Sequence, residues 1–134
     1  MKLQHAVLCA ALGVFAVTLA TAQDAVKADP KHYKVETENA QVRVLRIHYG
    51  PHEKSVMHSH PASVVVFLSD GNIKMTMPDG TTQNMTEKAG STQYTPAGVH
   101  LPENIGDKPF EAILVELKGK APTTTAAVAK PAEK

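Results

Sequence analysis

Three histidines are spaced so that they could act on a single metal ion. His58 and His60 stand two positions apart in the run Val56–His60. Successive side chains of an extended strand alternate between its two faces, so both imidazoles project from the same face. His100 follows a Pro-Ala-Gly turn at residues 96–98. Together the three would form a nitrogen ligand set for a divalent ion (Zn²⁺, Fe²⁺, Cu²⁺, Ni²⁺ or Mn²⁺) and leave positions open for water or substrate.

The first 22 residues have the three parts of a secretory signal peptide. Lys2 supplies a positive start, residues 6–20 are an apolar run, and Ala20-Thr21-Ala22 is a small-x-small cleavage site. We therefore expect an exported protein, periplasmic or secreted, that begins at Gln23 and carries no membrane span after cleavage. Cys9, the only cysteine, is removed with this segment. Any metal in the exported chain must then be held by nitrogen and oxygen ligands.

The overall charge gives no reason to expect a polyanionic partner. Of 14 basic residues, removal of Lys2 leaves 13, which balances the 13 acidic residues. Nucleic acids and anionic membranes need a concentrated basic patch, so we expect neither as a partner.

The composition divides the exported chain into three parts. Residues 23–32 are polar and predict an N-terminal lead-in. Residues 119–134 are Ala, Thr, Pro and Lys with almost nothing large to bury, which predicts a disordered tail. The folded part is therefore expected at residues 33–118. A domain so small, without disulfides, needs a regular core, a metal or a subunit partner, so a homodimer is a further expectation.

The folded part reads as strands and turns, with no helix expected outside the signal peptide. Alternating or continuous apolar runs predict the strands, and Gly, Pro, Asp and Asn mark the turns. Residues 70–72 and 78–80 are predicted hairpin turns. The expected strands are 41–49, 54–60, 63–68, 73–77, 81–86, 91–95, a short one through His100, and 110–117. Many short strands with frequent turns indicate an antiparallel sandwich or barrel.

Two stretches resemble the conserved motifs of the cupins. Residues 50–71, with His58-Ser59-His60 inside, are similar to the first motif, and residues 90–104, with His100, are similar to the second. The resemblance implies an all-β, antiparallel double-stranded β-helix, the cupin-type barrel. It also implies a divalent metal inside the barrel, held by the histidines of both motifs and a glutamate of the first. Here that glutamate position, four residues after His60 and seven before Gly71, is Val64, which we expect on the same interior face as the histidines.

Other side chains are weaker candidates for a site. His52, in a turn, could be a further ligand, whereas His32 and His48 are expected at the surface or an edge. Glu53 and Glu103 could replace the missing carboxylate, but turn positions favour solvated roles. Tyr94 could point into the cavity or lie in the core. Met75, Met77 and Met85 could bind copper, although barrel lining is the favoured interpretation.

Three hypotheses for function stay open. The first is a small exported cupin that binds a divalent metal and acts on a small molecule. The second is a barrel that captures a small ligand or a metal without turning it over. The third is a degenerate structural barrel without metal that acts by dimerising. The fold alone does not choose among them, and whether the protein is an enzyme is undecided.

Overall fold

The computed structural model describes residues 22–119. The expected signal peptide and C-terminal tail lie almost entirely outside these residues. One short helix is followed by nine strands, all antiparallel where they pair. The elements are α1 (Ala25–Ala28), β1 (Tyr33–Glu38), β2 (Val42–Tyr49), β3 (His58–His60), β4 (Ser63–Phe67), β5 (Gly71–Thr76), β6 (Thr82–Glu87), β7 (Thr92–Thr95), β8 (Gly98–Asn104) and β9 (Phe110–Leu117).

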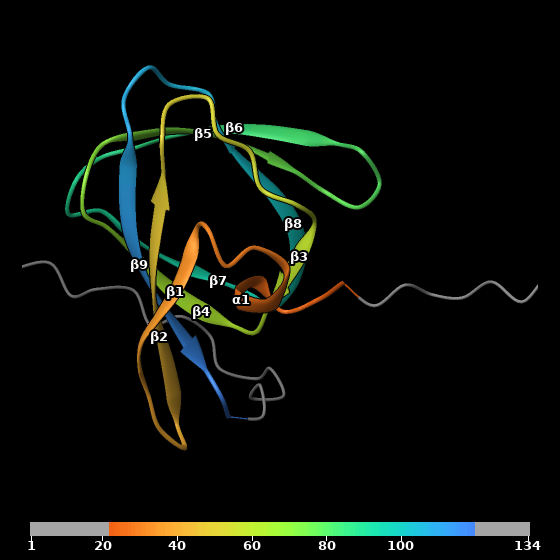
Figure 1. Cartoon of the computed structure of the whole chain (residues 1–134), viewed down its shortest axis with the longest axis vertical. Coiled ribbons are helices and arrows are strands. Elements are labelled where there is room, and N and C mark those ends of the chain that lie inside the picture. Colours follow the sequence, from red (N-terminus) through yellow and green to blue (C-terminus); the bar gives the residue numbers. More distant parts are fainter. Residues whose placement is uncertain (1–21, 120–134) are drawn as a thin grey trace, which may run out of the picture.

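The strands form two sheets that face each other around a common interior (Figure 1). The larger sheet has the order β1-β2-β9-β4-β7, and the smaller has the order β3-β8-β5-β6. The chain crosses between sheets after β2, β3, β4, β6, β7 and β8, and stays within one sheet only at the β1–β2 and β5–β6 hairpins. This winding is the double-stranded β-helix that the sequence led us to expect.

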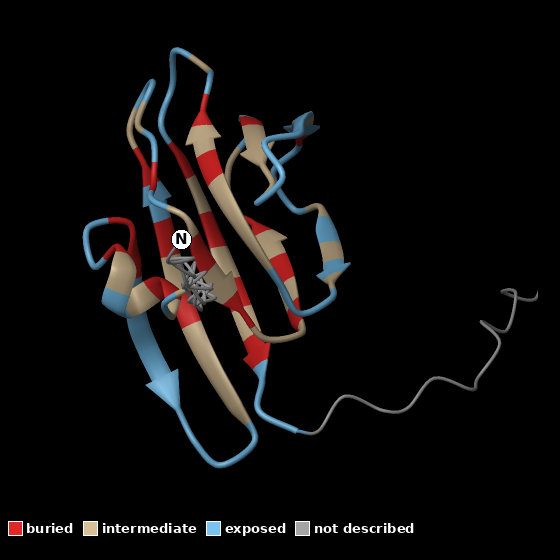
Figure 2. Cartoon of the chain, turned by 90° about the vertical axis from the view of Figure 1, so that its right-hand side faces the viewer, coloured by how far each residue is buried: buried red, intermediate tan, exposed pale blue. Residues whose placement is uncertain are grey.

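The core lies between the sheets and follows the two-residue period of the strands. In β4 and β9 buried and partly exposed residues alternate along the strand, which Figure 2 shows as bands across the larger sheet. Side chains of successive residues point to opposite faces, so each strand contributes every second residue to the interior. The buried apolar residues include Leu45, Tyr49, Ile73, Phe110 and Leu114.

The expectation of no helix beyond the signal peptide was wrong. Asp24 caps α1, since its side chain accepts a hydrogen bond of 3.1 Å from the backbone N–H of Val26. The helix packs beside β1 and β3 and buries Ala25 completely (Figure 1). A single turn is too short to give a helical period in the sequence, and its packing stabilises it.

Two turn predictions have different outcomes. The turn at residues 78–80 joins β5 to β6 in a true hairpin, and Gly80 has a φ of 84°, a value that favours glycine. The turn at residues 70–72 does not form a hairpin, because β4 and β5 lie in different sheets. Local turn residues mark where the chain reverses, but they do not say which strand it pairs with next.

The expected orientation of Val64 was also wrong. Residues 61–62 lie outside the strands, where the chain crosses from β3 in the smaller sheet to β4 in the larger. This crossing breaks the two-residue alternation that connected Val64 with His60. Ser63, Val65 and Phe67 face the interior, whereas Val64 lies on the outer face opposite Tyr94, which is 63% exposed.

Candidate metal centre

The register of two short strands brings the three histidines together. β3 pairs with β8 so that His58 lies directly opposite His100, and His60 shares the face of His58 one repeat further on. The ring centroid of His100 lies 5.2 Å from that of His58 and 5.4 Å from that of His60. One nitrogen of each ring lies within 4.8 Å of the others. The sequence-predicted residues therefore form one cluster, which could hold a metal ion.

Hydrogen bonds orient the two histidines of β3. Nδ1 of His58 lies 2.8 Å from the backbone carbonyl oxygen of Val56, and Nδ1 of His60 lies 2.7 Å from Oε1 of Glu116. Each acceptor requires that Nδ1 carries a proton, so Nε2 of the neutral ring is the nitrogen with a lone pair. These two Nε2 atoms lie 3.1 Å apart.

That arrangement fits a bound cation. Two imidazole nitrogens that each sit about 2.0–2.1 Å from a tetrahedral zinc ion are about 3.3 Å apart. Two lone pairs that face each other at 3.1 Å in a buried site repel unless a positive charge lies between them. The donor set, three neutral imidazoles, is suited to the first-row divalent metals.

Burial keeps two of the histidines neutral. Desolvation lowers the pKa of His58 to about 4, although the carbonyl of Val56 favours the charged ring. Desolvation, together with the other two histidines, lowers the pKa of His100 to about 3. Both rings are therefore uncharged near neutral pH, which is the form that binds metals.

The carboxylate that contacts the site was missed by the sequence analysis. Glu116 comes from β9 and is 1% exposed. Burial favours its neutral form, but hydrogen bonds from His60 and Arg43 hold the pKa of the carboxyl below its usual value. Nε of Arg43 donates to Oε2 over 2.5 Å. The available signal was that Glu116 is the one charged residue in the inward row of β9, after Phe110, Ala112 and Leu114.

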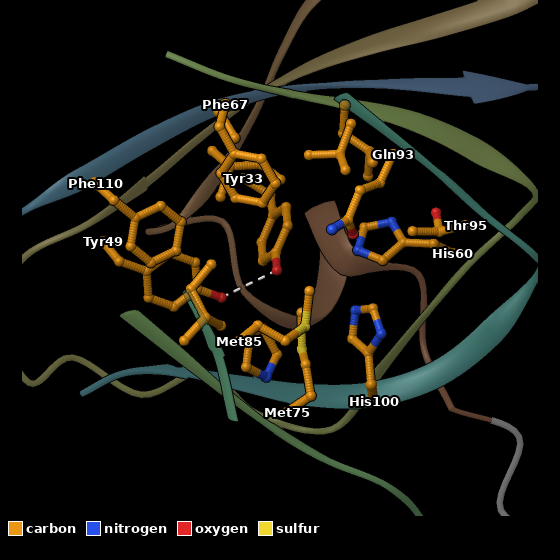
Figure 3. A pocket seen from close by; sticks show the side chains of 16 residues that line it. Tyr33, Tyr49, His60, Phe67, Met75, Met85, Gln93, Thr95, His100 and Phe110 are labelled. Atoms are coloured by element: carbon orange, nitrogen blue, oxygen red, sulfur yellow. Dashed lines mark hydrogen bonds between the residues drawn. The ribbon is translucent and has the colours of Figure 1, made fainter. Parts of the chain in front are cut away.

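A cavity of about 70 Å³ adjoins the histidines. His60 and His100 stand at one end, and Tyr49 and Phe110 stand at the other (Figure 3). Tyr33 crosses the space, and its hydroxyl lies 3.0 Å from the hydroxyl of Tyr49. The remaining wall is mainly apolar and comprises Ile47, Val65, Phe67, Ile73, Met75, Met85, Pro102, Ala112 and Leu114 together with Gln93 and Thr95. Val65 and Phe67 are the β4 residues that line this space, and Val64 does not line it.

Most of the weaker candidates lie away from the cluster. His52 is exposed, and its Nε2 lies 2.9 Å from Asp107. Tyr94 faces outward. Glu53 and Glu103 form ion pairs with Lys31 and Lys74 respectively and do not belong to the histidine cluster.

The predictions for the methionines and for the remaining histidines were only partly confirmed. Met75 and Met85 line the cavity, as the favoured interpretation predicted, whereas Met77 is not among its lining residues. His48 lies at the surface, as expected. The expectation for His32 was wrong, because this residue is 4% exposed and its ring stacks on Tyr49 at 4.1 Å. A buried carboxylate explains this position: Nδ1 of His32 lies 2.6 Å from Oδ2 of Asp29.

Solved structures share this architecture. A cupin domain from Bordetella pertussis has 25% sequence identity and a TM-score of 0.61, over 65% of this chain and 92% of that one. A double-stranded β-helix protein from Klebsiella pneumoniae has 26% identity and a TM-score of 0.54, over 66% and 77%. An RmlC-like cupin from Methanocaldococcus jannaschii, 22% identical with a TM-score of 0.52 over 66% and 83%, shares the fold. No protein-family model and no curated protein matches the sequence. Residues 22–119 contain no helix with the length and apolar character needed to cross a membrane.

Proposed function

Since the chain is a member of the cupin superfamily, we propose that it binds one divalent metal ion through His58, His60 and His100 and captures or transforms a small molecule in the adjoining cavity. The observation that carries this proposal is the pair of Nε2 atoms, 3.1 Å apart in a buried site, with His100 alongside. When bound, a divalent ion supplies a Lewis acid with open coordination positions. Glu116 fixes the ring of His60 and its tautomer, so that Nε2 is presented to the ion.

The cavity walls favour a small ligand that is mostly apolar. Among the residues that line it, none is Lys or Arg, so the protein offers no cation to pair with an anionic ligand. Gln93, Thr95 and the hydroxyl groups of Tyr33 and Tyr49 can form hydrogen bonds with a ligand, and the rest of the wall can only pack against it. A ligand with one polar group directed at the histidines and an apolar body matches this distribution.

The competing function is a barrel that binds a ligand without metal. One observation favours it: the inward residues of β4 are Ser63, Val65 and Phe67, so no carboxylate from this strand adds to the three imidazoles. A metal held only by neutral ligands is bound less tightly than one that also has an anionic ligand.

Metal analysis of purified residues 23–134 separates these functions. We expect one equivalent of Zn²⁺, Co²⁺ or Ni²⁺ to bind to the parent protein, and His58→Ala, His60→Ala and His100→Ala each to abolish binding. His52→Ala, which removes an exposed ring outside the cluster, is the matched control and should bind as the parent does. If the parent binds none of these ions and its melting temperature does not rise when they are added, the ligand-binding barrel without metal is the function that remains.

Export and dimerisation extend the proposal to the rest of the chain. We expect expression of the full chain in a bacterium to release a protein whose first residue is Gln23; recovery of uncleaved protein in the cytoplasm would contradict export. Sedimentation of that protein at twice the mass of one chain is the result expected for a homodimer, and sedimentation as a monomer would exclude it.

A further inference from the structure

The segment that precedes β1 is bound along the edge of β3. The backbone N–H of Ser59 donates to the carbonyl oxygen of Gln23 over 2.8 Å, and Oγ of Ser59 donates to the same oxygen over 3.3 Å. Asp24 and Ser59 form an isolated parallel bridge. Ser59 lies between His58 and His60, so the segment contacts β3 at the point where the strand carries two residues of the histidine cluster. We call residues 23–32 the N-terminal segment.

A chain of charged groups connects the N-terminal segment to His60. The guanidinium of Arg43 donates to both oxygens of Asp24, with an Nη1–Oδ1 distance of 3.3 Å. Its Nε donates to Oε2 of Glu116 over 2.5 Å, and Oε1 of Glu116 accepts the proton of His60 Nδ1 over 2.7 Å. The guanidinium is planar and rigid, so the position of Asp24 sets the plane in which Arg43 meets Glu116.

A second chain of hydrogen bonds leads to His58. Oγ of Ser55 donates to Oδ2 of Asp29 over 2.5 Å and lies 3.3 Å from Nδ1 of His58. Because the Ser55 hydroxyl proton is directed at Asp29, its oxygen can only accept from His58, which agrees with the tautomer required by Val56. Asp29 and Ser55 are 8% and 7% exposed, so water does not compete strongly for these bonds.

We propose that Asp24 and Asp29 are positioning residues of the metal centre, through which the N-terminal segment holds His60 and His58 in the tautomer and orientation that bind the ion. This inference rests on the proposed function. Neither aspartate reaches the ion. Asp24 acts through Arg43 and Glu116, and Asp29 acts through Ser55. The N-terminal segment is thus a working part of the site and not a passive lead-in.

The test measures Zn²⁺ affinity by competition with a chromophoric chelator, on residues 23–134 and their variants. Asp24→Asn and Asp29→Asn keep the size of each side chain and remove its charge. We expect each to weaken Zn²⁺ binding by about tenfold, the lower end of the effect of outer hydrogen-bond partners on metal affinity. Asp70→Asn and Asp79→Asn, exposed acids that pair with Lys88 and Thr81, are matched controls and should bind as the parent does.

Pairs of substitutions separate a positioning role from a general loss of stability. The loss of Zn²⁺ affinity in Asp24→Asn combined with Glu116→Gln should be smaller than the product of the two single losses, because both substitutions interrupt the same chain of contacts. In Asp24→Asn combined with Asp29→Asn, which interrupt different chains of contacts, the two losses of affinity should multiply. Asp24→Glu should recover part of the affinity. If Asp24→Asn fails to fold, Arg43→Lys tests the same series of contacts. The lysine ammonium keeps the positive charge but lacks the planar set of donors that binds Asp24 and Glu116 together.

A readout without metal keeps this inference distinct from the proposed function. In the metal-free parent, ¹⁵N chemical shifts of the imidazoles should show one Nδ1–H tautomer for His58 and His60. Asp24→Asn should weaken the preference of His60 for the Nδ1–H tautomer. Asp29→Asn should weaken that of His58 to a smaller extent, because the carbonyl of Val56 still accepts from its Nδ1. If the parent binds Zn²⁺ and both variants bind it equally well, or if the tautomers in the variants are unchanged, the role of both aspartates is overturned. A parent without Zn²⁺ but with the expected tautomer changes would overturn only the metal function.

Discussion

Oε1 of Glu116 lies 2.7 Å from Nδ1 of His60, although the two residues stand 56 positions apart in the chain. β9 carries Glu116 into the interior, where the carboxylate also accepts from Arg43. The contact decides which nitrogen of His60 carries the proton.

The first prediction concerns Glu116 itself. Glu116→Gln keeps the shape of the side chain but removes the charge that fixes the tautomer of His60. We expect Zn²⁺ affinity to fall by about 10- to 100-fold, as measured by chelator competition. Glu111→Gln, on the outer face of the same strand, is the matched control. Equal affinities in the two variants would show that the contact does not serve the metal.

The second prediction separates the two valines of β4. Val65 faces the cavity that His60 and His100 line, whereas Val64 lies on the outer face. Val65→Glu should therefore add an anionic ligand and raise the affinity for Zn²⁺ or Ni²⁺, while lowering the stability of the metal-free protein because a buried carboxylate lacks partners. Val64→Glu should change neither by much. Tighter binding in the Val64 variant would mean that β4 has the opposite orientation.

The third prediction is a pH dependence that comes from Asp29. Burial opposes its charge, yet hydrogen bonds from Ser55 and His32 hold its pKa below the ordinary 3.8. A folded pKa below the unfolded one contributes stability above about pH 4, and this contribution disappears as the pH falls through the folded pKa. Asp29→Asn should thus be less stable than the parent at pH 7, by about 1–3 kcal/mol for charged hydrogen bonds.

Urea unfolding of the metal-free proteins at pH 7, 5, 4 and 3 measures that difference. The groups around Asp29 are Ser55 and His32, and Glu53 lies beyond, 3.2 Å from Nε2 of His32. The difference in the free energy of unfolding between the parent and Asp29→Asn should become smaller toward pH 3. A gap that is constant across this range would mean that the Asp29 charge does not stabilise the fold.

The fourth prediction tests the core. Leu45 of β2 is fully buried between the sheets. Leu45→Ala should lower the free energy of unfolding by about 2–5 kcal/mol, because it removes buried methyl groups and leaves a cavity. Val35→Ala in β1, where the side chain is 44% exposed, should cost less than about 1 kcal/mol. Similar losses in the two variants, measured by urea unfolding, would contradict the packing of β2 between the sheets.

Local chemistry in the sequence was sufficient for the fold class and for the choice of histidines. Alternation along residues 41–49 and 110–117 reports strands, because the two-residue period is a property of the backbone itself. The spacing of His58 and His60 places both rings on one face for the same reason. The resemblance of residues 50–71 and 90–104 to the cupin motifs then indicated the barrel, and the solved structures share it.

Only the tertiary structure decided what surrounds those histidines. The crossing at residues 61–62 resets the alternation, so Val65 and not Val64 faces inward. The register of β9 against its neighbours brings Glu116 to His60, and burial of α1 brings Asp24 and Asp29 into the chains that reach the cluster. Periodicity within one strand is local and can be read from residue types. Which face turns inward after a crossing, and which distant side chain meets it, depends on the packing of the whole barrel.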